Sequence, residues 1–124
     1  MSNARNISEM KESQVAKAWV NFDGEFATSP FTEANGGIRD SFNVTSITDR
    51  GTGRYTVNLT SAMASADYAV SALCGNGDGS NIGTTTSVAN ETVLTSSAFG
   101  IRVSQGNAAI DKVFVSLIFF GESS

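Results

Sequence analysis

The sequence contains no histidine, and it has one cysteine and one proline among its 124 residues. Without an imidazole side chain, Ser-His-Asp and Cys-His catalytic sites cannot form, and zinc sites that depend on histidine are excluded as well. The single cysteine, Cys74, excludes an intramolecular disulfide, and with it the disulfide-stapled type of small secreted domain. The run YAVSALCG around Cys74 indicates a small buried residue rather than a reactive thiol.

Charge is scarce too, since 16% of residues are charged and the net charge is −4. A chain of this kind offers no basic stripe for a phosphate backbone, so we expect no nucleic-acid partner. No apolar run approaches the roughly 18 residues that span a bilayer, and the N-terminus lacks an apolar signal region. We therefore expect a soluble protein, made in a cytoplasm, with no membrane insertion.

The acidic residues do not form an evident catalytic pair. Two carboxylates would suffice for a glycosidase that acts on polysaccharide, and the chain has twelve acidic residues. Asp23, Asp49, Asp78 and Asp111 lie in turn-like contexts, where an Asx turn or solvation explains them. The sequence therefore predicts a protein that is not an enzyme.

Polarity is carried instead by Ser, Thr, Asn and Gly, which favour turns and exposed strand faces over helix interiors. From Ala16 onward apolar and polar residues alternate with a period of two. Residues 43–63 form two such stretches about a turn that contains Gly51 and Gly53, which is typical of a hairpin. We expect one all-β domain over 16–124, a small antiparallel β-sandwich of about six to eight strands.

The last strand, KVFVSLIFFG, is apolar on both faces. One sheet of a sandwich covers only one of those faces, so the other face needs a second layer, which another subunit can supply. Trp19 could serve as a platform for a sugar ring, but packing in the core or against a subunit explains a single tryptophan better. The oligomer interface predicted from this reasoning comprises Trp19, Phe114, Ile118 and Phe120.

Residues 1–15 form a separate N-terminal segment with helical character. Asn6 and Glu9 have capping-box spacing, and Ile7, Met10 and Gln14 follow a heptad pattern. A helix this short is marginal alone, so we expect a short helix or extended arm that packs on its own domain, on symmetry copies or on a larger assembly.

The loop GNGDGSNIG is longer than a turn requires and is rich in small polar residues. It has one carboxylate, so it lacks the ligand set of a calcium-binding EF-hand loop, and no Gly-Lys-[ST] follows to bind phosphate. We expect no metal and no cofactor. If the loop is more than a plain surface connection, its ligand-binding residues are Asn76, Asp78, Ser80 and Asn81.

Three stretches, AKAWVNFDG, IRDSFNVTSITDRGTGRYTVNLTSAM and ADYAV, together resemble a module of tail-fibre and other virion proteins of tailed bacteriophages. The likeness runs from Lys17 to about Val70 and continues weakly to the end of the chain. The matching positions, in order, are Trp19, Asn21, Phe22, Gly24, Ile38, Arg39, Phe42, Asn43, Asp49, Gly51, Gly53, Tyr55 and Val57.

The resemblance implies a virion protein that assembles as a homotrimer and binds a glycan or protein of the host surface. The N-terminal segment would then attach it to other virion proteins. Only about 15 residues precede the module, where a fibre tip would follow a long shaft. A head or tail decoration or adaptor protein with no host ligand therefore stays as the alternative.

Overall fold

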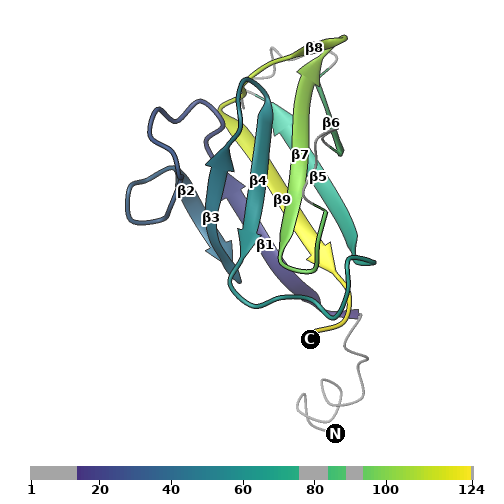
Figure 1. Cartoon of the computed structure of the whole chain (residues 1–124). Coiled ribbons are helices and arrows are strands. Elements are labelled where there is room, and N and C mark those ends of the chain that lie inside the picture. Colours follow the sequence, from purple (N-terminus) through teal and green to yellow (C-terminus); the bar gives the residue numbers. More distant parts are fainter. Residues whose placement is uncertain (1–13, 76–83, 89–93, 124) are drawn as a thin grey trace, which may run out of the picture.

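The computed structural model describes residues 14–75, 84–88 and 94–123, and these residues form nine strands in two stacked sheets (Figure 1). The helix expected within 1–15 falls almost entirely on residues outside this range. The strands are β1 (Ala16–Phe22), β2 (Ile38–Phe42), β3 (Val44–Asp49), β4 (Arg54–Leu59), β5 (Ala69–Gly75), β6 (Thr84–Val88), β7 (Ala98–Gln105), β8 (Ala108–Ala109) and β9 (Phe114–Phe120).

Both sheets are antiparallel. The first sheet has the strand order β2-β1-β9-β5, and the second has the order β3-β4-β7-β6, with β8 paired to β7. The two sheets pack face to face, so the predicted all-β sandwich is confirmed. Figure 1 shows the start of β1 and the end of β9 at one end of the sandwich, whereas β8 and the β3–β4 turn lie at the opposite end, here called the turn end.

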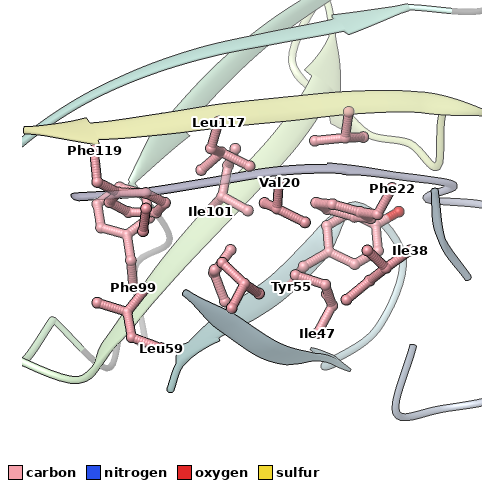
Figure 2. Close-up of a cluster of buried hydrophobic side chains, with 14 of the residues drawn as sticks. Val20, Phe22, Ile38, Ile47, Tyr55, Leu59, Phe99, Ile101, Leu117 and Phe119 are labelled. Atoms are coloured by element: carbon pink, nitrogen blue, oxygen red, sulfur yellow. The ribbon is translucent and has the colours of Figure 1, made fainter. Parts of the chain in front are cut away.

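The core forms where the inner faces of the two sheets meet. The period-two pattern of the sequence places Ala18, Val20 and Phe22 of β1 in the interior, each at most 1% exposed. Aromatic and branched side chains of the second sheet face them, among them Tyr55 and Ile101 (Figure 2). Each large side chain buried in this way contributes roughly 1.5 to 3 kcal/mol to folding.

One residue carries the chain from the first sheet to the second. Asn43, between β2 and β3, has a φ of 59°, a left-handed conformation that Asn tolerates better than most residues. Its side-chain amide donates to the carbonyls of Lys17 and Ser61, each at 3.1 Å, and its Oδ1 accepts from the Ser61 amide at 2.7 Å. The pattern IRDSFNV reads as one strand in the sequence, but this single bend divides it between two sheets.

The margin of the sandwich beside β2 and β3 is closed by the connection between β1 and β2. Phe31 exchanges two backbone hydrogen bonds with Ile47 of β3, and the Ile38 amide donates to the Thr32 carbonyl. The Phe31 ring is fully buried, with its centroid 6.0 Å from that of Phe22. Phe31 therefore seals this margin, as expected for an anchor in an irregular connection.

Strand β6 was not expected, because the sequence around it reads as part of a long polar loop. Its Thr and Ser residues show no apolar alternation, yet they pair in register with β7, for example Thr86 with Val103. A β-branched threonine suits an extended edge strand, although it carries no hydrophobic signal. With β6 and the two-residue β8, the described residues hold nine strands, slightly more than predicted.

Candidate functional site

The outer faces of the two sheets differ in character. On the second sheet the outward side chains are mostly polar, including the paired Arg54 and Arg102, and several of the shorter ones bond to one another. The Asn58 side-chain amide donates to Ser46 Oγ at 3.2 Å and to Thr48 Oγ1 at 3.0 Å, and the hydroxyls of Thr85 and Ser104 lie 3.0 Å apart. A face of this composition is suited to water.

The outer face of the first sheet carries large apolar side chains, interrupted by polar ones such as Asn21, Ser71 and Ser116. Across neighbouring strands, Trp19 of β1 lies opposite Phe42 of β2 on one side and opposite Ile118 of β9 on the other. Leu73 of β5 is 68% exposed and lies opposite Ser116, two residues from Ile118 on β9. The whole apolar set, here called the outer strip, comprises Trp19, Phe42, Leu73, Phe114, Ile118 and Phe120.

The exposed apolar area of the outer strip is within the range of the largest patch on a typical monomer, which is often functional. Trp19 and Phe42 are 36% and 53% exposed, and with Leu73 they leave on the order of 300 Å² of apolar area on one face. A shallow hollow runs between Trp19 and Leu73 across β9. Patches of several hundred Å² rimmed by polar residues mark interaction surfaces in soluble proteins.

A polar rim lies where β1 and β2 leave this face. The Arg39 guanidinium donates to Asn21 Oδ1 at 3.1 Å and to the Val113 carbonyl at 2.6 Å, which ties β2 to β1 and to the start of β9. An apolar centre beside hydrogen-bonded polar groups is the usual anatomy of a protein–protein interface.

All four residues of the predicted interface lie on the outer strip: Trp19, Phe114, Ile118 and Phe120. Trp19 is therefore not a core residue. Leu73 was not predicted from the sequence, although the alternation along β5 turns it outward while its neighbours Ala72 and Cys74 point inward.

Phe42 was missed for a different reason. It is four residues from Ile38, so simple alternation places both on the same face. Ile38 pairs with Phe22 on the inner face, whereas Phe42 pairs with Trp19 on the outer face, because a register shift between β1 and β2 adds one residue to β2. A bulge of this kind moves each later residue of the strand to the other face of the sheet. The sequence carries no signal for this bulge.

At the turn end, a buried polar network holds the loops together. The Tyr55 hydroxyl lies 2.7 Å from both the Gly24 carbonyl and Asp111 Oδ1, and the Gly53 amide donates to the same carboxylate oxygen at 2.7 Å. Burial raises the pKa of Tyr55 far above its usual range, and the hydrogen bond to Asp111 and the carboxylate charge raise it further. The network has a structural role, since it ties β4 to the connections on either side of the sandwich.

Tyr55 makes folding stability dependent on pH in the alkaline range. Its pKa is raised in the folded state, so its contribution is complete below the unfolded value of about 10 and is lost as the pH rises above it. We expect Tyr55→Phe to lower stability at pH 7 by about 1 to 2 kcal/mol, because a buried partner is removed. Above pH 10 the difference in free energy of unfolding between the native protein and Tyr55→Phe should narrow. Urea unfolding of both proteins at pH 7 to 11 measures this difference.

Tyr68→Phe is the matched control for this experiment, since burial raises the pKa of Tyr68 as well but no carboxylate hydrogen-bonds to it among the described residues. Above pH 10, the difference in free energy of unfolding between the native protein and Tyr68→Phe should narrow less than the difference for Tyr55→Phe. Stability curves for native protein and Tyr55→Phe that stay parallel up to pH 11 would contradict the assignment.

The predicted ligand-binding residues Asn76, Asp78, Ser80 and Asn81 lie outside the described residues. Strand β5 ends at Gly75, which pairs with Phe114 at the start of β9, so the chain enters this loop at the turn end. Burial raises the pKa of the half-buried Cys74 thiol, in part offset by a hydrogen bond from Thr84 and the charge of Lys112, which favours the unreactive thiol form.

Over 14–75, 84–88 and 94–123, no three His, Cys, Asp or Glu side chains gather into a group suited to a metal ion. The same residues include no helix with the length and apolar character needed to cross a membrane. Comparison of the chain with protein-family models, curated proteins and solved structures finds no match. The resemblance to phage virion proteins therefore stays a prediction from the motif residues.

Proposed function

We propose that the chain is a non-enzymatic structural protein of a phage virion, which assembles as a homotrimer through the outer strip and presents its turn end to the host surface. The observation that carries this proposal is the apolar outer face of the first sheet, which the sandwich itself leaves exposed. The polar outer face of the second sheet is the surface that such an assembly would leave in water.

The residues of the phage-like motif support this division of roles. Asn43, Gly53 and Tyr55 are each explained by internal geometry, through a left-handed bend, a close backbone approach or a buried hydrogen bond. Trp19 and Phe42 are not explained in this way, because they lie opposite each other across β1 and β2 on the exposed side of the sheet. Contact with another copy gives these two aromatic residues a reason to be there.

The size of the face limits such a contact. Four strands of five to seven residues cover an area of roughly 20 Å by 20 Å, on the order of 400 Å² in projection. This is about half of the roughly 800 Å² that each partner buries in a standard interface, so contact through this face belongs to the small class of interfaces.

The direction of the chain through the sandwich agrees with the proposed attachment. Ala16 at the start of β1 pairs with Phe120 at the end of β9, so β1 begins at the end of the sandwich opposite the turns. A protein attached to the virion through its N-terminal segment thereby presents its turns outward. Three copies give three weak sites, and multivalent attachment raises the avidity without a tight single site.

The proposal is tested first by replacing Ile118 with aspartate at the centre of the outer strip. We expect the native protein to sediment as a trimer and the variant as a monomer or an insoluble protein, because an unpaired charge buried in an interface costs several kcal/mol. This cost weakens association by at least about 100-fold. Trp19 is the only tryptophan, so its fluorescence reports burial of the strip directly.

The matched control is Thr45→Asp, which adds the same charge at an exposed position of the second sheet. It should sediment as a trimer and keep the concentration-dependent blue shift of Trp19 emission. A native protein that stays monomeric up to about 100 μM, with Trp19 emission independent of concentration, contradicts assembly through the strip.

The same pair of variants separates host binding from a purely structural role. Purified native trimer and Thr45→Asp should block adsorption of the parent phage to its host, whereas folded Ile118→Asp monomer should block at least about tenfold less well, because avidity is lost. If folded native trimer does not block at all, the decoration or adaptor role replaces host binding.

A further inference from the structure

The two margins of the sandwich are closed differently. Phe31 seals the margin beside β2 and β3, whereas among the described residues the margin beside β5 and β6 is covered only in part, by side chains such as Tyr68 and Val70. Strand β5 pairs only with β9, and β6 only with β7. Two long hydrogen bonds link them, from Thr86 Oγ1 to the Ala72 carbonyl at 3.4 Å and from Thr84 Oγ1 to the Cys74 carbonyl at 3.5 Å.

A cavity of about 330 Å³ opens at this second margin. Its inner wall consists of core residues of β7, Phe99 and Ile101, which are 7% and 1% exposed. Its outer walls include the small side chains Ala72 of β5 and Thr86 of β6, and larger apolar side chains, Val70 and Leu94, also line it. Phe99 and Ile101 stay buried, so they form the floor of the cavity while the side chains of β5 and β6 form its mouth.

The aromatic wall of the cavity is held rigidly. The Tyr68 hydroxyl lies 2.8 Å from the Thr95 carbonyl and 3.0 Å from the Ala98 carbonyl, so its proton is held between two acceptors. The Tyr68 ring packs edge-on against Phe119 at 5.8 Å and tilted against Phe99 at 6.3 Å. A wall fixed in this way loses little freedom when a ligand binds to it.

The chemistry of the lining selects the kind of ligand. The described lining side chains are uncharged, mostly apolar inside, with the hydroxyls of Thr86 and Ser87 on the β6 side. Ligand sites begin at about 300 Å³, so the volume suits one small ring. We propose that this margin cavity binds a neutral six-membered ring with an apolar face and hydroxyl groups at its edge, from either a phenol or a sugar unit. The proposal does not depend on assembly through the outer strip.

The test is a titration of the ¹⁵N-labelled protein, followed by amide chemical shifts, with phenol and separately with a methyl 6-deoxyhexoside. We expect saturable shifts confined to residues of the margin cavity, such as Ala72, Thr86 and Ile101, with a Kd on the order of millimolar for ligands of this size. Saturation by phenol alone identifies a phenolic ligand, and saturation by the hexoside alone identifies a sugar.

Two substitutions and a control decide whether the cavity is the site. Ala72→Leu fills the space and should weaken binding at least tenfold, whereas Ala108→Leu, the same change at an exposed position of β8, should leave Kd unchanged. Thr86→Leu narrows the cavity from the opposite wall and should also weaken binding. It replaces Ala72→Leu in the test if that variant does not fold. Native affinity in a folded wall variant, or no saturable shift with either probe, overturns the proposal.

Discussion

Replacing Gly53 with alanine is expected to destabilise the sandwich by about 3 kcal/mol or more. Gly53 has a φ of 69°, which costs an alanine roughly 1 to 2 kcal/mol by itself. A Cβ at this position would also collide with the Val103 carbonyl and lie 2.7 Å from the Ile110 amide nitrogen. Both are backbone atoms of the β7–β8 region, so they cannot move away without loss of strand pairing.

Gly106→Ala is the matched control, because Gly106 has a φ of 60° but a Cβ added to it would meet no atom within 4 Å. It carries the conformational cost alone, about 1 to 2 kcal/mol. Urea unfolding of the two variants measures the difference, which is the cost of the backbone collision. Equal loss of stability in both variants would show that the region around Gly53 relaxes freely.

Phe31→Ala is expected to cost about 3 to 5 kcal/mol, the range for removal of a buried phenylalanine ring. The Phe31 ring is fully buried, and it packs against Phe26 at 5.7 Å and against Tyr55 at 6.1 Å. Its loss opens the margin that it seals, so the cost combines lost contacts with a new cavity. Chemical unfolding at a concentration where the protein is monomeric gives this value.

Phe42→Ala is the same chemical change at a position that is 53% exposed. Measured in the Ile118→Asp background, where assembly does not contribute, it should cost less than about 1 kcal/mol. A loss for Phe42→Ala that approaches that of Phe31→Ala would mean that the outer strip stabilises the single subunit, and would weaken the case for an interface.

The sequence predicted the parts of the fold that follow from local periodicity. Alternation along β1 and β9 indicated their inner faces, and the glycines of the β3–β4 turn indicated the hairpin. It did not predict the bend at Asn43 or the bulge that turns Phe42 outward, because each depends on pairing with a distant strand. Strand β6 was missed because its threonines carry no hydrophobic pattern.

The candidate surfaces were predicted to different extents. Phe114, Ile118 and Phe120 could be assigned to an interface because a strand that is apolar on both faces needs two covering layers, and both faces are visible in one stretch of sequence. The margin cavity could not be found in this way. Ala72, Thr86 and Phe99 line it from three different strands. No local sequence pattern marks any of these residues as part of a cavity.

The pairing of β1 with β9 determines how the sandwich resists a pulling force. The two strands are adjacent and antiparallel, and Ala16 at the start of β1 pairs with Phe120 at the end of β9. A force between Ala16 and Phe120 would separate β1 from β9 one pair at a time. A force between the start of β1 and the turn end runs along the strands instead, where hydrogen bonds perpendicular to the strands resist together in shear. A protein tethered at its N-terminal end and pulled at its turns is therefore loaded in its strongest direction.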